Sequence, residues 1–334
     1  MILAAVILVA AFILDLLVGD PPFRFHPVRV IGFCISFLEK LLLTFGLSGL
    51  AGGILLAAGV IALSVGGYLA VRFLLSELHP WIAAALDFWL IYSCLALGDL
   101  LEHASEVAEP LDEIDLPRAR GALQRIVGRD TGLLEPVAVA RGAVESVAEN
   151  FVDGVLSPLF WYTAVVLVCH LAGCSAPTAA GVSALVCFKA ISTLDSMVGY
   201  RHGHYLLFGR ASAKLDDLAN FAPARLSLMF LYIGALLSGE SSGSGWKVAR
   251  RDRLKHLSPN AGHAESFVAG ALGIRLGGPT VYQGTTVDKP WLGEGDEEVG
   301  ADHIRRCCKL VYRSSWMAVL LITNFLILFS FVLQ

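Results

Sequence analysis

Charged side chains are scarce in this sequence. Asp, Glu, Lys and Arg together account for only 16% of the 334 residues, whereas apolar residues account for 56%. The mean hydropathy is +0.67. Soluble globular domains average about 25% charged and about 45–50% apolar residues. The composition therefore excludes an ordinary soluble domain and predicts an integral membrane protein.

The sequence also lacks several signatures of well-known sites. It has no G-x-x-x-x-G-K-[ST] loop, so a nucleotide would be held without the phosphate-binding loop of the P-loop proteins. No block of Lys and Arg alternates with aromatic residues, and the net charge is −4, which argues against a nucleic-acid partner. The seven cysteines include no two pairs at metal-ligand spacing, so neither a zinc site nor a disulfide framework is expected.

Apolar segments are plentiful, and seven of them are candidates for crossing a membrane. The first contains Asp15 and lacks both a basic start and a small-residue cleavage site, so we expect a retained membrane helix and not a signal peptide. Several of the seven are shorter than the roughly 20 residues that a crossing requires. Segment 28–46 is amphipathic and is a candidate for lying in the membrane interface. The candidate spans are 2–19, 50–71, 81–98, 155–172, 176–191, 222–238 and 315–333.

Three long polar regions, 99–154, 192–221 and 240–314, separate these segments. The first contains helical patterns that are broken at Pro110 and Pro117. We therefore expect an all-α fold, namely a polytopic α-helical integral membrane protein with helical polar insertions between membrane segments. The whole chain, 1–334, is expected to form one domain.

The side of the membrane on which each polar region lies is weakly determined. Region 240–314 carries eleven Lys and Arg against nine acidic residues, which favours the cytoplasm, although the charge rule weakens for long loops. A crossing by 222–238 would place this region opposite 99–154. That segment has only 17 residues and contains Arg225, so a re-entrant segment is the alternative.

A stripe of carboxylates lies directly before the apolar segment 155–172. Arg141, Glu145, Glu149 and Asp153 are four residues apart, so on a helix they share one face. An Arg141–Glu145 pair would be ordinary on a helix surface, but it leaves Glu149, Asn150 and Asp153 without cations. Carboxylates near hydrocarbon are costly and indicate a functional site, and Mg²⁺ prefers a few carboxylate oxygens together with phosphate.

Other polar clusters lie at the edges of apolar segments. The composition of the motif at 19–32 fits either a capped turn or a binding loop. The motif at 189–227 mixes acidic and basic residues, which fits either a phosphate–metal site or a solvated connector. In the motif at 256–284, glycines 270, 273, 277 and 278 would let the backbone approach a ligand. The candidate residues are Asp20, His26, Arg29, Arg129, Asp130, Lys189, Asp195, Tyr200, Lys214, Asp216, Asp217, Asn220, Arg225, Asn260, Glu265 and Arg275.

An ordered set of motifs resembles the adenosylcobinamide-phosphate synthases, membrane enzymes of cobalamin biosynthesis. Phe23 and Ser192 stand where the family pattern has Trp and Asn, and neither change removes an ionisable group. The motifs extend from residue 19 to 279: GDPPFRFHPVRVIG, GRDTGLLE, ARGAVESVAENFVDGVLSPLFW, KAISTLDSMVGYR, FGRASAKLDDLANFAPARL and SPNAGHAESFVAGALGIRLGGP.

The resemblance implies formation of an amide bond. The propionate carboxyl of adenosylcobyric acid would be joined to the amine of (R)-1-amino-2-propanol phosphate, or a close analogue, with ATP as co-substrate and Mg²⁺ as cofactor. The corrinoid would be a substrate and not a cofactor. The implied location is the cytoplasmic membrane, as a multi-pass protein with the active site facing the cytoplasm. Other membrane-bound cobalamin assembly enzymes are candidate partners.

Roles within this implied reaction are assigned as a hypothesis. Catalytic residues would be Glu145, Glu149, Asp153 and Asp217, and metal ligands would be Glu149, Asp153, Asp216 and Asp217. Phosphates or corrin carbonyl groups would be held by Arg29, Arg129, Lys189, Lys214 and Arg275, and amides would be oriented by Asn150, Asn220 and Asn260. Further substrate-binding candidates are Asp20, His26, Asp130, Asp195, Tyr200, Arg225 and Glu265.

Two other kinds of protein fit the composition. A transporter for corrinoids or another phosphorylated solute would carry ionisable residues deep inside its spans and would show inverted repeats. The sequence shows no such repeat, and its charges gather at segment ends. A membrane scaffold for corrinoid intermediates would leave the carboxylate stripe unexplained. The synthase is therefore the favoured hypothesis.

Overall fold

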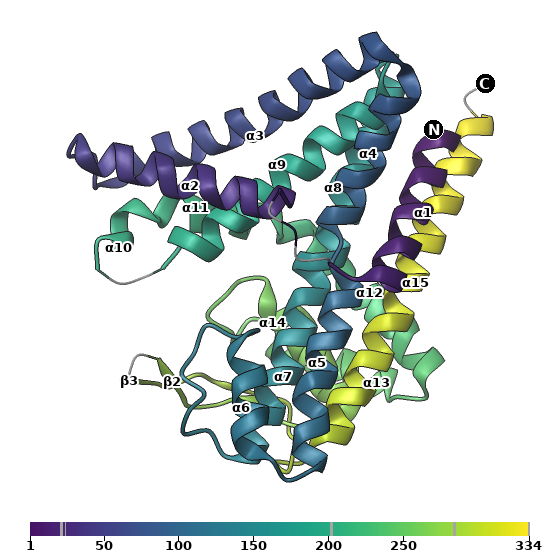
Figure 1. The fold of residues 1–334 in the computed structure, drawn as a ribbon. Coiled ribbons are helices and arrows are strands. Elements are labelled where there is room, and N and C mark those ends of the chain that lie inside the picture. The colour runs from purple at the N-terminus through teal and green to yellow at the C-terminus, as the bar shows by residue number, and fades with distance from the viewer. Residues whose placement is uncertain (21–22, 24, 201–202, 283–284, 333–334) are drawn as a thin grey trace. The chain divides into compact units, whose positions relative to one another are not determined.

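Helices make up most of the structure, which confirms the prediction of an all-α fold (Figure 1). The computed structural model describes all residues except 21–22, 24, 201–202, 283–284 and 333–334. Within the described residues, six helical stretches are long and apolar enough to cross a membrane, so the chain is a multi-pass membrane protein. These stretches are Leu50–Leu78, Pro80–Asp112, Pro136–Leu171, Pro177–Val198, Phe221–Ser238 and Ala301–Phe331.

The helices match the apolar segments of the sequence, with two differences. Segment 2–19 forms a helix of 17 residues, Ile2–Val18, which is shorter than the six long stretches. Two of the long stretches begin or end inside the polar region 99–154, because helical structure continues beyond the apolar residues. The sequence therefore located the helices but underestimated their length.

The chain divides into two compact units. Unit 1 comprises Met1–Ala96, Ser157–Asn220 and Val319–Gln334, and unit 2 comprises Leu97–Leu156 and Phe221–Ala318. The helices of unit 1 are α1 (Ile2–Val18), α2 (Pro27–Thr44), α3 (Leu50–Leu78), α4 (Pro80–Cys94), α8 (Ser157–Leu171), α9 (Pro177–Val198), α10 (Tyr205–Phe208) and α11 (Arg210–Ala219), together with the end of α15 (Ala301–Val332).

Unit 2 contains the remaining elements. The strands are paired antiparallel as β1 with β4 and β2 with β3. The elements are α5 (Leu97–Asp112), α6 (Leu116–Gln124), α7 (Pro136–Phe151), the π-helix η1 (Val152–Leu156), α12 (Phe221–Ser238), α13 (Ser242–Asp252), α14 (Ala261–Leu272), β1 (Leu276–Gly277), β2 (Thr280–Tyr282), β3 (Thr285–Val287), β4 (Trp291–Leu292) and the first part of α15.

In unit 1, helices α2, α3 and α9 pack around an apolar cluster that includes Ile35, Leu56 and Leu194. A Cβ atom added at Gly53 would lie only 1.8 Å from the carbonyl oxygen of Phe208, so glycine is required where α3 meets α10. Inside the α3–α4 hairpin, Arg72 and the hydroxyl of Tyr68 both donate to the buried carboxylate of Asp87. This pairing satisfies a charge that would be costly inside an apolar unit.

The carboxylate stripe lies on α7 and η1. Pro158 follows η1 and has no N–H to donate to the carbonyl of Gly154, four residues earlier, so the regular α-helical hydrogen bonding cannot continue there. The chain adopts a π-helical turn at Val152–Leu156, immediately before α8. Such turns occur often at functional sites, and this one ends the segment that carries Glu145 and Glu149.

A buried aspartate joins α13 to the chain after β4. The Asp252 carboxylate is fully buried, and it accepts hydrogen bonds from the Gly293 amide at 2.9 Å and from Arg251 at 2.6 and 2.8 Å. The Lys255 ammonium lies 2.6 Å away. Burial alone would raise the pKa of Asp252, but these donors hold the pKa below its usual range.

Replacing Asp252 by alanine is therefore expected to destabilise unit 2 by about 3 kcal/mol, because Arg251, Lys255 and the Gly293 amide lose a shared acceptor. Since the folded pKa is depressed, the stabilisation is present above the unfolded pKa of about 4 and is lost as the pH falls below it. Thermal unfolding of the purified protein between pH 3 and pH 7 measures both effects. An unchanged unfolding temperature at pH 7 would contradict this role, and Asp302→Ala, at an exposed acid on α15, is the control.

Candidate active site

Unit 2 contains a polar cavity of about 200 Å³. Its walls come from α7, from α14, from the loop 126–129 that precedes α7, and from the segments around β1 and before β4. Charged side chains of both signs line it. The four sequence-predicted residues that line it are Arg129, Glu145, Glu149 and Glu265. The structure thus brings together residues from three separate motifs.

Glu145 is held at both of its carboxylate oxygens. Oε2 accepts a hydrogen bond from Nη2 of Arg129 at 2.9 Å, and Oε1 accepts one from the backbone amide of Gly277 at 2.8 Å. Both side chains of the ion pair are largely buried, with exposed fractions of 8% for Arg129 and 12% for Glu145. Two hydrogen bonds fix the position of this carboxylate. We therefore interpret Glu145 as a residue that orients Arg129.

Two glycines make this geometry possible. A Cβ atom at Gly142, one turn before Glu145 on α7, would lie 2.2 Å from Nη2 of Arg129, so only glycine leaves room for the guanidinium. Gly277 has a φ of +79°, which disfavours any other residue, and its amide is the donor to Glu145. The buried Nε of Arg129 has no hydrogen-bond partner among the described residues.

Glu265 is the most deeply buried carboxyl of the cavity. It lies on α14 with 5% of its side chain exposed. Burial raises the pKa of Glu265 well above its usual range, and the negative charges of Glu145 and Glu149 raise it further. Lys289 and Arg129 oppose this effect to a smaller degree. The cavity therefore holds a carboxyl group with a raised pKa, Glu265, together with a carboxylate that is paired with a cation, Glu145.

Two residues that line the cavity were missed by sequence reasoning. His256 and Lys289 both line the cavity. Nδ1 of His256 accepts a hydrogen bond from the Ser258 amide at 3.0 Å. In the neutral ring the proton is therefore on Nε2, which lies 3.8 Å from Glu265. Burial lowers the pKa of His256, and the charge of Lys289 lowers it further. His256 opens the motif at 256–284, whereas nothing in the local sequence marks Lys289.

Arg141 does not form the ion pair with Glu145 that its spacing suggests. Its guanidinium lies 4.7 Å from the ring centre of Trp291, and the guanidinium of Arg275 lies at the same distance from that ring. Arg275 also forms an ion pair with Glu297. The reason for the difference is that Arg129, from outside the helix, occupies the position beside Glu145. The ordinary interpretation of the stripe as a helix-surface pair is therefore wrong for Arg141.

The other predicted residues of unit 2 do not line this cavity. Asn150 donates to the carbonyl oxygen of Ser146 at 2.9 Å, and Asn260 accepts from Arg225 at 3.4 Å. Asp130 is exposed, and Asp153 is partly buried in η1. Asn150 and Asn260 thus have hydrogen-bond partners within unit 2.

The predicted residues of unit 1 form several small local groups. Asp20 lies 3.0 Å from Nε2 of His26, and Lys214 lies 3.6 Å from Asp217. Asn220 donates to Asp216 at 3.1 Å and accepts from Ser157 at 2.6 Å.

The remaining predicted residues of unit 1 lie apart from these pairs. The Asp195 carboxylate lies against Gly199, where an added Cβ would be 2.0 Å from its Oδ1. Arg29 and Tyr200 are exposed, and Lys189 lines an apolar cavity within unit 1. The predicted grouping of these residues with those of unit 2 stays a prediction.

No group of three or more His, Cys, Asp or Glu side chains among the described residues is arranged to hold a metal ion. In the cavity, the oxygens of Glu145 already accept from Arg129 and Gly277, and burial raises the pKa of Glu265. Glu149 is the remaining lining carboxylate. The donor set thus fits a Mg²⁺ ion that is bound mainly by phosphate oxygens, as is common for this ion.

The glycines of the motif at 256–284 have structural roles. A Cβ atom at Gly270 would lie 2.5 Å from the Ser244 carbonyl oxygen, so this glycine lets α14 pack closely on α13. Gly273 ends α14 in the left-handed conformation. A Cβ at Gly278 would meet the ring of Trp291 at 2.4 Å. Of the four, only Gly277 lines the cavity. Approach of the other three to a ligand stays a prediction.

Comparison with known proteins gives consistent results. The sequence profile of the family described as "CobD/Cbib protein" matches residues 8–311. Two proteins named "Cobalamin biosynthesis protein", CbiB of Salmonella paratyphi B and CobD of Klebsiella pneumoniae, are each 42% identical to the chain and cover 93% of it and 94% of their own length. CobD of Desulfotalea psychrophila is 41% identical over 97% of both chains. No solved structure matches the chain.

Proposed function

The chain belongs to the CobD/CbiB protein family, and from this we propose that it is an adenosylcobinamide-phosphate synthase. The proposed reaction joins the propionate carboxyl of adenosylcobyric acid to the amine of (R)-1-amino-2-propanol phosphate, or a close analogue, and uses ATP. It would make the protein a ligase that forms a carbon–nitrogen bond. The relatives' names support a place in cobalamin biosynthesis, and the cavity of unit 2 supports the chemistry.

The observation that carries the proposal is the combination of charges in that cavity. Arg129 and Lys289 are cations suited to phosphate oxygens. Glu265, with its raised pKa, is a stronger base than an ordinary carboxylate whenever it is ionised. A phosphorylated amine needs both groups: cations for its phosphate, and a base that removes a proton from its ammonium.

The proposed reaction has two steps. In the first, the terminal phosphoryl group of ATP passes to an oxygen of the corrinoid carboxylate, which gives an acyl phosphate and ADP. In the second, the amine nitrogen attacks the acyl carbon, the carbon–nitrogen bond forms, the bond between the acyl carbon and the phosphate oxygen breaks, and phosphate leaves with the second nitrogen proton. Before this attack the ammonium gives one proton to Glu265, which His256 contacts from the loop before α14. Arg129 stabilises negative charge on the phosphoryl oxygens, and Lys289 holds the phosphate of the amine.

Mg²⁺ enters this proposal with ATP. Glu149 would be its carboxylate ligand in the cavity, and Asp153, four residues later, is a further candidate. When bound, the ion neutralises phosphate charge during phosphoryl transfer. We propose that the cavity faces the cytoplasm from the cytoplasmic membrane, because ATP is supplied there and basic residues of 240–314 favour that side. Release of product to other membrane-bound assembly enzymes would follow from this location.

The test is an assay with the purified full-length protein in detergent. It receives adenosylcobyric acid, aminopropanol phosphate and MgATP, and the products are followed by mass spectrometry. We expect adenosylcobinamide phosphate together with one ADP and one phosphate per amide formed. A protein that binds the corrinoid without amide formation or ATP turnover would refute the synthase, and would favour a transporter or a scaffold for corrinoid intermediates.

Lys289 should contribute mainly to binding of the phosphorylated amine. Replacing it by methionine keeps the length of the side chain and removes the charge. We expect the KM for the amine phosphate to rise about 30-fold, because a charge-assisted contact contributes roughly 2 kcal/mol, while kcat changes little. Lys247→Met, at an exposed lysine on α13, is the control. Equal KM values for both variants would remove Lys289 from the binding site.

A further inference from the structure

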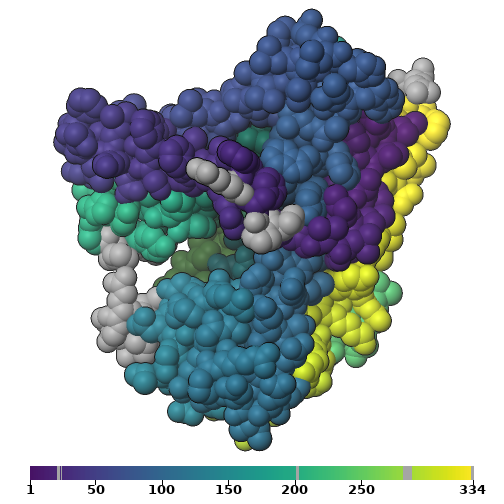
Figure 2. Space-filling view, in the orientation of Figure 1, coloured from purple at the N-terminus to yellow at the C-terminus, as the bar shows by residue number. Residues whose placement is uncertain are grey.

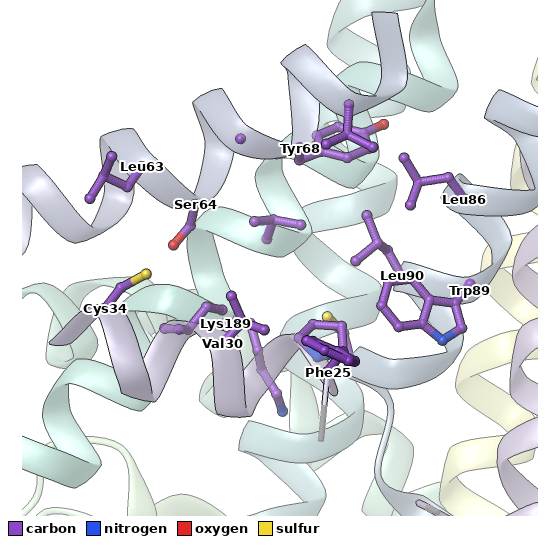
Figure 3. Close-up of a pocket in the computed structure, with 16 residues that line it drawn as sticks. Phe25, Val30, Cys34, Leu63, Ser64, Tyr68, Leu86, Trp89, Leu90 and Lys189 are labelled. Carbon is purple, nitrogen blue, oxygen red and sulfur yellow. The ribbon is translucent and has the colours of Figure 1, made fainter. Parts of the chain in front are cut away.

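Unit 1 contains a second cavity of about 340 Å³, which shares no lining residue with the cavity of unit 2. It lies among α2, α3, α4 and α9 (Figure 3). Its size falls in the range of roughly 300–1,000 Å³ that is typical of small-molecule sites. Figure 2 shows the surface hollowed between α2 and α3, with α9 visible at the floor.

The walls of this cavity are almost entirely apolar. Helix α3 contributes Leu63 and Val71, and α4 contributes Leu86, Trp89 and Leu90. An apolar cavity with so few polar groups cannot hold a polar substrate in a stable position, since each buried polar atom would lack a hydrogen-bond partner. The walls therefore suit a hydrocarbon chain.

The cavity opens along a helix that is long and apolar enough to cross a membrane. Leu63 and Val71, which line the cavity, are 54% and 47% exposed. Only 22% of the most apolar stretch of α3 is buried within the protein. An exposed apolar surface on such a helix faces lipid, so lipid chains are the most abundant apolar molecules at the opening.

One cation marks the cavity. Lys189 lies on α9 at a lining position, and its side chain extends away from Tyr68 in Figure 3. The structure gives its ammonium no ion pair with another described residue, whereas Arg72, on α3, is paired with Asp87 at 3.0 Å. A cation at the edge of an apolar cavity complements an amphiphile whose head carries a negative charge.

We propose that this cavity binds one acyl chain of an anionic membrane phospholipid, with the phosphate of the lipid at the Lys189 ammonium. The apolar walls select the chain and the lysine selects the charge of the head group. The occupant is a lipid of the surrounding bilayer and not a substrate of the proposed reaction. The sequence analysis predicted that Lys189 binds a phosphate of a substrate. In this proposal Lys189 binds the phosphate of a membrane lipid instead.

Glycine 67 offers a way to close the cavity. It lines the cavity on α3, and no atom lies within 4 Å of the position that a Cβ would occupy. A phenylalanine at this position would therefore extend into open space without displacing backbone. Gly66 also has nothing within 4 Å of its Cβ position but does not line the cavity, so Gly66→Phe is a matched control.

The experiment uses the full-length protein in phosphatidylcholine nanodiscs that contain a phosphatidylglycerol with a photoactivatable diazirine in one acyl chain. Peptide mass spectrometry locates the adducts. We expect adducts on residues 63–71 of α3 and 86–90 of α4. The yield of these adducts should be about fivefold higher than with the same diazirine chain on phosphatidylcholine, since one basic side chain near an anionic head group contributes roughly 1 kcal/mol. Gly67→Phe should remove the cavity adducts, and Gly66→Phe should retain them.

The charge is tested separately. Lys189→Met should abolish the preference for phosphatidylglycerol, and Lys40→Met, at a lysine of α2 outside the cavity, should not. Equal labelling by the two lipids in the unaltered protein would overturn the recognition of an anionic head group. Adducts that persist in Gly67→Phe would overturn occupancy of the cavity. The comparison of lipids with the unaltered protein does not depend on the folding of any variant.

Discussion

Replacing Glu265 by glutamine is expected to lower the rate of amide formation about 100- to 1,000-fold, the contribution of a positioned general base. Glutamine keeps the size of the side chain and cannot accept the ammonium proton. The proposed acid–base role depends on burial of this carboxyl and on its proximity to Glu145 and Glu149, which together raise its pKa. Steady-state kinetics of the purified enzyme measure the effect, with Glu298→Gln as a control at a glutamate outside the cavity.

The pH dependence distinguishes a base from a structural residue. Because the base must be ionised, the rate should fall as the pH drops through the raised pKa of Glu265. Glu149→Gln removes a nearby negative charge, so the acid limb of the kcat profile should move to lower pH. An acid limb at the same pH in Glu149→Gln and in the unaltered enzyme would contradict the role of Glu265.

Stability provides a second measurement that does not require substrate. The folded pKa of Glu265 is raised above its unfolded value of about 4.3. The folded state therefore binds more protons, so this contribution to stability is fully present below the unfolded pKa and is lost as the pH rises through the folded pKa. Glu265→Gln should remove this part of the pH dependence of thermal unfolding, whether or not the proposed reaction is correct.

Replacing Arg129 by methionine is expected to destabilise unit 2 by about 3 kcal/mol, since Glu145 would keep its buried charge without its ion-pair partner. Synthase activity should fall at least 100-fold, because the same guanidinium is proposed to hold phosphoryl oxygens. The positive charge of Arg129 also lowers the pKa of Glu265, so any residual activity should show its acid limb at higher pH. Chemical unfolding and steady-state kinetics measure the two effects.

A double variant separates the structural from the functional part of this prediction. Arg129→Met combined with Glu145→Gln removes both charges, so most of the lost stability should return. Activity should not return, because the cation that is proposed to contact phosphate is still absent. Recovery of activity in the double variant would show that Arg129 only supports the fold. Arg118→Met, at an exposed arginine of α6, is the control.

The sequence was sufficient for features that depend on local pattern. Apolar runs located the membrane helices, because a helix exposed to lipid must be apolar over its length. The four-residue spacing of Glu145, Glu149 and Asp153 indicated a shared helix face, and α7 with η1 confirms that they lie in one helical segment. Ordered motifs were sufficient for the family, because they extend over most of the chain.

The tertiary structure decided which of these polar residues meet. Glu145 pairs with Arg129 and with the amide of Gly277, 132 positions away, and not with Arg141 on its own helix. Lys289 enters the same cavity from a loop without any local signal. Charge patterns in a sequence give spacing along one helix, whereas the partner of a buried charge is set by the packing of distant segments. For that reason the carboxylate stripe could be read from the sequence, but the cavity around it could not.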